Sequence, residues 1–235
     1  MKTFIYPIAF CLLLSSCSNV YYAPNVQNVP LIKNINDIKI NAGLGITEGS
    51  TEIAVQSSFA LDSVWAAQIN FSNSITKSGT EIHQLDVAIG RYKGRTNNWI
   101  TEVYAGIGFA GYNWNTQSPS VKFNAVKTYL QGNLGYSIKN LEIVFSIRTG
   151  TNTMFNGISS LNKYYIDVQH FTPIGNSYTF FVAEPAVTLR AGSSNFKIQV
   201  QLGFSSGTGF NDYNLYQDNF NFNTGFVFLF NKKKS

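Results

Sequence analysis

Residues 196–204 read Phe-Lys-Ile-Gln-Val-Gln-Leu-Gly-Phe, in which apolar and polar side chains alternate almost without a break. This period of two predicts a β-strand with two unlike faces, because successive side chains of a strand point to opposite sides. The alternation recurs along the chain from residue 36 on. It predicts ten strands, at about 37–46, 52–61, 64–72, 81–91, 98–112, 125–138, 141–150, 178–190, 195–205 and 220–231. Residues 160–171 also alternate, so eight or twelve strands remain alternatives.

The polar faces of these strands carry mainly amides, hydroxyls, Tyr and Gly, with isolated charges of both signs. A water-soluble barrel would expose a face rich in Lys and Glu, yet charged residues make up only 12% of this chain. An amide-rich face suits the lumen of a transmembrane barrel, whose apolar face contacts lipid and whose closed sheet leaves no backbone group unpaired. We therefore predict an all-β fold: a closed, antiparallel, up-and-down transmembrane β-barrel over residues 36–231.

The connections between the predicted strands alternate in length. Those near 62–63, 92–97, 138–140 and 191–194 are short, and those between them are equal or longer. Outer-membrane barrels alternate periplasmic turns and external loops in this way. With ten strands, both ends of the barrel sequence fall at the short-turn end. We expect the preceding linker to be tethered at that end too.

The first residues have the features of an export signal. Lys2 gives a basic start, and residues 4–14 form an apolar run of signal-peptide length. Leu14-Ser15-Ser16-Cys17 resembles a bacterial lipobox, after whose cleavage the Cys becomes residue 1 of the mature chain and carries acyl chains. The resemblance implies a signal peptide over residues 1–16, lipidation of Cys17 and a stable membrane anchor. An ordinary signal peptide that contains a Cys is the alternative.

Two consequences of this resemblance concern charge and location. Loss of Lys2 with the signal changes the net charge from +5 to +4, and loss of Cys11 leaves no free thiol beside an acylated Cys17. Residues 18–22 contain no acidic residue. Surface-exported lipoproteins of Bacteroidota usually carry an acidic signal there, so we expect an anchor in the periplasmic leaflet of the outer membrane.

The linker, residues 17–35, contains the stretch Tyr21-Tyr22-Ala23-Pro24-Asn25-Val26-Gln27-Asn28-Val29-Pro30-Leu31. Its prolines and amides predict extended, non-helical chain. The stretch resembles the start of an uncharacterised family of Bacteroidota outer-membrane lipoproteins, in which Tyr-x-Ala-Pro-Asn-x-x-Asn-Val-Pro precedes a predicted barrel. The family has no assigned activity. At the other end, residues 232–235 are expected to form a solvated basic tail.

Several charged residues fall on the predicted inner face. We expect them to form a polar network in the lumen; a narrow pore lined by them is the alternative. Ten strands favour the network, because eight-stranded barrels are already filled by side chains and open channels need about sixteen strands. The predicted network consists of Asp86, Glu102, Lys127, Glu142, Arg148, Glu184 and Arg190.

Catalytic and metal-binding residue types are scarce. The only histidines are His83, predicted on the outer face, and His170, predicted in a long loop near Asp167. No metal-ligand spacing is present, so we expect no metal, no cofactor and no enzymatic activity.

The sequence predicts an outer-membrane lipoprotein with a structural or interaction role in the cell envelope. Its expected partners are membrane lipid, contacted through acylated Cys17 and the barrel wall, and envelope proteins or lipopolysaccharide, with no nucleic acid. One alternative is a lipid-tethered soluble barrel that binds a small apolar ligand. Another is an outer-membrane enzyme acting on lipid A or peptides.

Overall fold

The computed structural model describes residues 22–77, 79–114, 121–159, 177–209 and 217–231. The predicted signal peptide, Cys17, His170 and the basic tail lie outside these residues, as does the alternating segment 160–171. The strands in the described part are β1 (Asp37–Thr47), β2 (Ser50–Ala60), β3 (Trp65–Thr76), β4 (Thr80–Thr96), β5 (Trp99–Trp114), β6 (Val121–Ser137), β7 (Leu141–Ser159), β8 (Tyr178–Gly192), β9 (Phe196–Phe204), β10 (Ser206–Gly209) and β11 (Phe220–Asn231). No described helix is long and apolar enough to cross a membrane.

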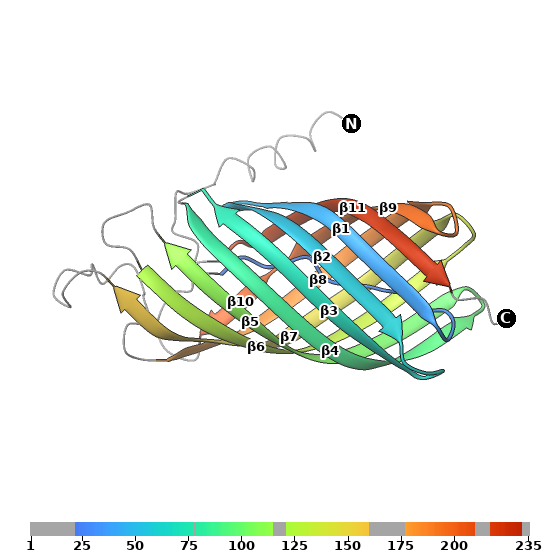
Figure 1. The fold of residues 1–235 in the computed structure, drawn as a ribbon, viewed down its shortest axis with the longest axis horizontal. Coiled ribbons are helices and arrows are strands. Elements are labelled where there is room, and N and C mark those ends of the chain that lie inside the picture. The colour runs from blue at the N-terminus through green and yellow to red at the C-terminus, as the bar shows by residue number, and fades with distance from the viewer. Residues whose placement is uncertain (1–21, 78, 115–120, 160–176, 210–216, 232–235) are drawn as a thin grey trace, which may run out of the picture.

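The strands form one closed antiparallel sheet (Figure 1). From β1 to β8 each strand pairs with the next in sequence, and β11 closes the ring by pairing with β9 on one side and β1 on the other. Only Ser205 separates β9 from β10, and both pair with β8, so together they occupy one place in the wall. The predicted ten-stranded, up-and-down barrel is therefore confirmed.

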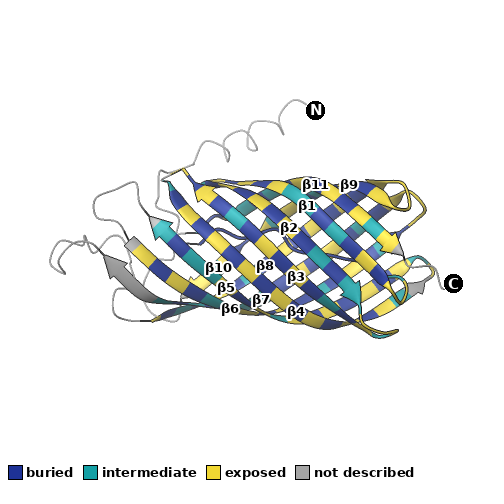
Figure 2. Cartoon of the chain, viewed as in Figure 1, coloured by how far each residue is buried: buried dark blue, intermediate teal, exposed yellow. Residues whose placement is uncertain are grey.

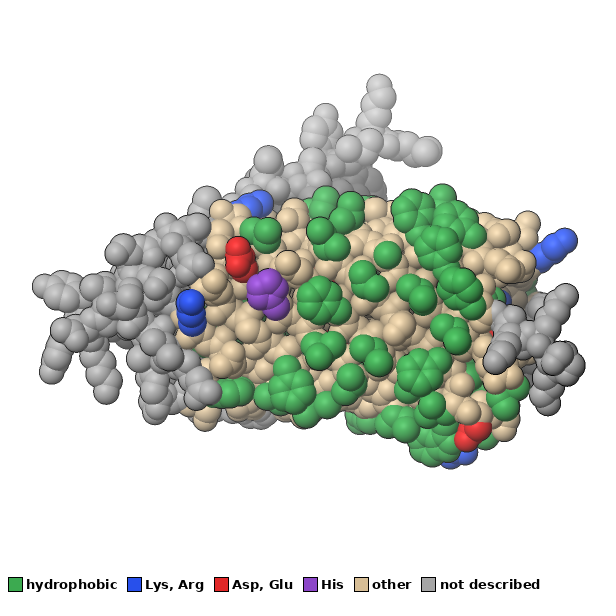
Figure 3. Space-filling model, viewed as in Figure 1, with side chains coloured by type: hydrophobic (Ala, Val, Ile, Leu, Met, Phe, Trp, Pro, Cys, Tyr) green, Lys and Arg blue, Asp and Glu red, His purple; other side chains and the backbone are tan. Residues whose placement is uncertain are grey.

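The wall has its apolar face outside and its polar face inside. In β7 Phe145 is 56% exposed while Arg148 is 2% exposed, and in β9 Ile198 is 52% exposed while Gln199 is fully buried. Burial alternates along the strands in Figure 2, and hydrophobic side chains are spread over the middle of the wall in Figure 3. Alternation at period two produces this arrangement directly, because the closed sheet has only an inner and an outer face.

The two ends of the barrel differ in their connections. At one end the strands are joined by residues 61–64, 97–98, 138–140 and 193–195. Asn97 and Asn98 have φ values of 50° and 71°, as a two-residue type I′ hairpin requires. At the other end lie residues 48–49 and 77–79 and three longer connections. The predicted loops at 47–51 and 73–80 are shorter than expected because the strands continue further into them.

The chain before β1 does not stay at the short-turn end. Asp37 pairs with Asn231 there, but residues 22–32 are all buried inside the barrel, and the blue trace of this segment crosses the interior in Figure 1. Tyr22 forms a β-bridge with Gln217 at the long-loop end. The expectation that the linker stays at the short-turn end is therefore wrong for its described residues. An extended chain with no strand beside it needs hydrogen-bond partners for its backbone, and the polar lumen supplies them.

We expect unheated protein in SDS to migrate differently from a boiled sample. A closed sheet offers detergent no free edge at which unfolding can begin, so the barrel should stay compact until it is heated. The measurement is a gel with both samples side by side. Identical mobility would contradict a closed membrane barrel.

Candidate functional site

Residues 22–33, which we call the luminal segment, fill the interior of the barrel. At mid-lumen the Asn25 side chain bonds to three charged wall residues. Its amide nitrogen donates to Asp86 at 3.0 Å, and its amide oxygen accepts from Lys127 at 3.0 Å and from Arg148 at 2.7 Å. Arg148 also donates to the Asn25 backbone oxygen at 2.9 Å. An amide is suited to this position, because it both donates to a carboxylate and accepts from cations.

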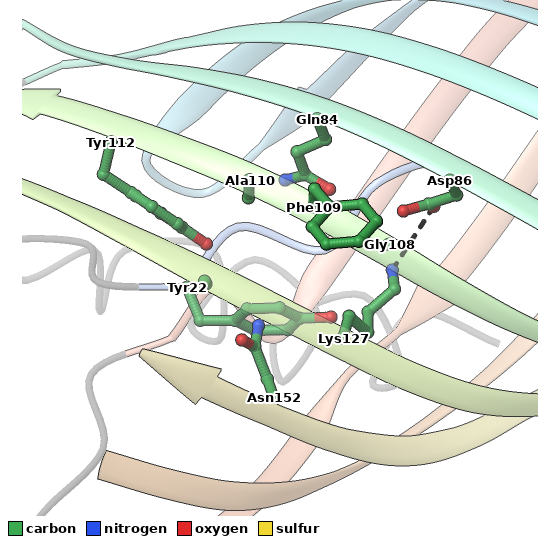
Figure 4. A pocket seen from close by; sticks show the side chains of 10 residues that line it. Tyr22, Gln84, Asp86, Gly108, Phe109, Ala110, Tyr112, Lys127 and Asn152 are labelled. Carbon is green, nitrogen blue, oxygen red and sulfur yellow. Dashed lines mark ion pairs between the residues drawn. The ribbon is translucent and has the colours of Figure 1, made fainter. Parts of the chain in front are cut away.

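Tyr22 takes part in the same network from the end of the luminal segment. Its hydroxyl donates to Glu184 at 2.5 Å, and Arg148 forms an ion pair with the other oxygen of Glu184 at 2.5 Å. A second ion pair joins Lys127 to Asp86 at 3.6 Å. Figure 4 shows this pair beside Tyr22 and Asn152. Each of these charges is compensated within the lumen, as buried charges require.

Amide side chains of the wall act as hydrogen-bond partners for the backbone of the luminal segment. Gln201 accepts from the Gln27 nitrogen at 2.8 Å and donates to the Gln27 oxygen at 3.0 Å. Gln56 donates to the Val26 oxygen at 2.9 Å, and Gln131 donates to the Asn28 oxygen at 2.6 Å. These bonds replace a β-ladder, so the segment can remain extended without pairing to any strand inside the lumen.

Asn28 and Gln27 also bind the wall through their own side chains. The Asn28 amide donates to Asn70 at 2.7 Å and accepts from the Ser58 hydroxyl at 3.2 Å. The Gln27 amide donates to the backbone oxygen of Glu184 at 2.5 Å. The amides that, with the prolines, predicted an extended linker are thus the groups that hold it in place.

At the short-turn end, Glu142 gathers several cations. Lys33 and Lys197 each lie 2.8 Å from it, and Arg190 lies 3.6 Å away. Two further bonds hold the backbone of the luminal segment: Lys39 donates to the Leu31 oxygen at 2.8 Å, and Glu102 accepts from the Ile32 nitrogen at 2.7 Å. This cluster fixes the point at which the segment leaves the lumen.

Apolar clusters lie on either side of the polar centre. Around Tyr22 the cluster contains Ala23, Ile82, Tyr112, Phe123, Ala125, Met154, Tyr178, Phe180 and Val182. Towards the short turns, Val29 and Leu31 pack against Ile100 and Val144, and Ile32 packs within a group of tyrosines and alanines. The cavity beside Tyr22 in Figure 4 has room for about one water molecule. In the described residues the lumen is therefore packed.

The long-loop end also ties the luminal segment to the connection between β10 and β11. The Asp218 nitrogen donates to the Tyr22 oxygen at 3.1 Å, and Asn221 donates to the Pro24 oxygen at 2.7 Å. The Asp218 carboxylate accepts from Thr47 in the neighbouring turn. Burial raises the pKa of Asp218, and the bond from Thr47 opposes that shift. Asp218 therefore links two connections of the barrel to the luminal segment.

All seven residues of the expected network are buried in the lumen: Asp86, Glu102, Lys127, Glu142, Arg148, Glu184 and Arg190. They divide into two groups. One group surrounds Tyr22 and Asn25 and consists of Asp86, Lys127, Arg148 and Glu184. The other group lies at the short-turn end, where Glu142 pairs with Arg190 and Glu102 bonds to Ile32.

Sequence reasoning missed the luminal segment as part of the site. One signal was available in the sequence. Ile82, Ile100 and Val144 stand in the inward phase of their strands, and apolar side chains at such positions indicate that something apolar packs against them inside the barrel. They pack against the segment or against its apolar neighbours.

The two histidines do not join this site. His83 is exposed on the outer face of β4, and His170 lies outside the described residues. In the described part of the chain, no group of three His, Cys, Asp or Glu side chains could hold a metal ion.

Gly135 in β6 lies directly beneath Leu31. A Cβ at this position would lie 2.3 Å from the Leu31 Cδ2 atom. We expect Gly135→Val to lower the free energy of unfolding by about 1–3 kcal/mol through overpacking, and Leu31→Ala to relieve part of this loss in the double variant. Urea unfolding of the barrel in lipid vesicles, followed by tryptophan fluorescence, measures both.

Gly132 in the same strand provides the matched control, because its Cβ would meet nothing within 4 Å. Gly132→Val should therefore have a smaller effect than Gly135→Val. Equal losses in the two variants, with no relief from Leu31→Ala, would contradict the packing of Leu31 against β6.

No protein-family model matches the chain, and no curated protein matches it. Among solved structures, the outer membrane protease OmpT from Escherichia coli is similar with a TM-score of 0.49 and 12% identity, covering 84% of this chain and 94% of that chain. The NanC porin has a TM-score of 0.42 and 10% identity, with 81% and 98% covered. The KdgM porin has a TM-score of 0.40 and 11% identity, with 82% and 99% covered. These similarities concern the barrel fold and nothing beyond it.

Proposed function

We propose that this protein is a lipid-anchored outer-membrane β-barrel, closed by its own N-terminal segment, with a structural or interaction role in the cell envelope. The observation that carries the proposal is the luminal segment: wall side chains bind it from Tyr22 to Lys33. A barrel with a packed lumen offers partners its outer wall and its external loops rather than a passage. Membrane lipid, envelope proteins and lipopolysaccharide are the partners that such surfaces can contact.

Outer-membrane placement is supported by the apolar outer wall and by the predicted export signal. Ile53, Phe145 and Ile198 are each more than half exposed on the outer face. Exposure of such apolar side chains is unfavourable in water but favourable in the hydrocarbon of a membrane. A tethered soluble barrel would need the opposite arrangement of faces, so we do not favour it. Lipidation of Cys17 is supported by the lipobox resemblance alone.

The resemblance to Bacteroidota lipoproteins bears on the same proposal. The stretch that carries it, residues 21–31, coincides almost completely with the luminal segment. Within it Pro24, Asn25 and Asn28 use their backbone oxygens or side chains to bond to the wall. We propose that this stretch serves to fill a lumen wherever the family carries it.

An enzymatic role has less support. The charged groups of the lumen are engaged with the luminal segment, which occupies the place that a substrate would need. His83 faces the lipid side of the wall and therefore stands apart from them. We propose that the protein has no catalytic activity.

Dye efflux from reconstituted vesicles tests the closed barrel. We expect the purified full-length protein to leave a small trapped dye in place. A variant in which residues 22–33 are replaced by Gly and Ser at equal length should release the dye faster, because the lumen loses its packed side chains. Rapid efflux through the unaltered protein would overturn the proposal of a closed lumen. Incorporation of a labelled fatty acid, lost in Cys17→Ala, tests the lipid anchor separately.

A further inference from the structure

The luminal segment crosses the barrel from the short-turn end to the long-loop end without turning back. Lys33 lies beside Ser137 and Glu142 at the short-turn end. Going back along the chain, Asn28 reaches Asn70 near the middle of the barrel. Tyr22 then meets Gln217 and Asp218, in the connection between β10 and β11, at the long-loop end. Tyr22, the first residue that the structure describes, therefore lies at the end of the barrel opposite to the start of β1.

Only four residues, 18–21, lie between Cys17 and Tyr22, so five Cα–Cα steps join the two residues. Fully extended, they span at most about 18 Å. The apolar band of an outer-membrane barrel is about 25 Å tall. A route back through the lumen is closed by the luminal segment itself. A route along the outer wall would place unpaired backbone groups in hydrocarbon, which costs several kcal/mol for each group.

We infer that Cys17 carries its acyl chains in the external leaflet of the outer membrane, so that the protein is anchored from the cell surface. This inference rests on the proposed lipidation and on the rule that long loops of such barrels face outward. It replaces the expectation of a periplasmic-leaflet anchor, which was drawn from the absence of acidic residues at 18–22. The partner of the acyl chains is thus the lipid layer that surrounds the external loops.

The geometry makes this anchor independent of any acidic export signal. The barrel wall spans the membrane, and the luminal segment passes from one side to the other inside it. A chain arranged in this way reaches the external side together with its own barrel. The absence of acidic residues at 18–22 then carries no information about the leaflet.

Cysteine labelling of intact cells tests the inference. Three single variants are made in the full-length protein: Asn19→Cys beside the anchor, Lys77→Cys in the exposed β3–β4 turn at the long-loop end, and Ser194→Cys in the exposed β8–β9 turn at the short-turn end. The probe is a maleimide that does not cross the outer membrane. We expect Asn19→Cys and Lys77→Cys to be labelled on intact cells and Ser194→Cys only after permeabilisation, with at least about a tenfold difference in signal.

Each other result has a definite meaning. If Asn19→Cys, like Ser194→Cys, is labelled only after permeabilisation, the surface anchor is overturned. Labelling of Ser194→Cys but not Lys77→Cys on intact cells would show an inverted barrel and would overturn it too. The parent chain reports on lipidation: an acylated Cys17 leaves it unlabelled even after denaturation. Label on the denatured parent would instead refute the proposed anchor, a failure distinct from that of the leaflet assignment.

Discussion

Arg148→Met is expected to lower the free energy of unfolding by about 3–5 kcal/mol, the cost of leaving a buried charge without its partner. Arg148 is 2% exposed, forms an ion pair with Glu184 at 2.5 Å and donates two further bonds to Asn25. Its loss leaves Glu184 with the hydroxyl of Tyr22 as its remaining described side-chain partner. Urea titration of the barrel in lipid vesicles gives the free energy from the midpoint and slope.

Neutralising Glu184 in the same background identifies the cause. The double variant Arg148→Met, Glu184→Gln should be more stable than Arg148→Met alone, because the unpaired carboxylate is removed. Lys77→Met, in an exposed turn, should change stability by less than about 0.5 kcal/mol. If the stability losses of Arg148→Met and of Glu184→Gln, each measured alone, add up to the loss of the double variant, the ion pair does not stabilise this part of the lumen.

Asn25→Leu is expected to lower the free energy of unfolding by roughly 2–5 kcal/mol. Leucine has nearly the same shape but cannot bond to Asp86, Lys127 or Arg148, and a buried charged group that loses a hydrogen bond is costly. The same change should also release the luminal segment, so we expect faster dye efflux from reconstituted vesicles. Efflux and unfolding are measured on the same preparation.

Asn195→Leu is the matched control, because Asn195 lies exposed in the β8–β9 turn. It should leave both the unfolding free energy and the efflux rate close to those of the parent. A stable Asn25→Leu variant with unchanged efflux would show that the luminal segment is held mainly by its apolar clusters and not by the amide.

The wall of the barrel could be predicted from sequence because two-faced strands have a simple signature. Phe145 and Arg148 fall in opposite phases of one alternating run, and this fixes which side each one faces. The luminal segment has no such signature. Its prolines and amides predict only an extended chain, whereas the partners of Asn25 lie 61 to 123 residues away in the sequence. Local patterns cannot reveal contacts at that distance.

The path of the luminal segment has a consequence for the order of assembly. Tyr22, Gln27 and Leu31 are bulky, and all are buried against the wall in the part of the lumen that the structure describes. A finished ring could not admit them by sliding from one mouth to the other. The luminal segment must therefore already be in position when β1 pairs with β11 along Asp37–Thr47 and Asn221–Asn231. Biogenesis of this protein then ends with the seam between its first and last strands, which close around a thread of the same molecule.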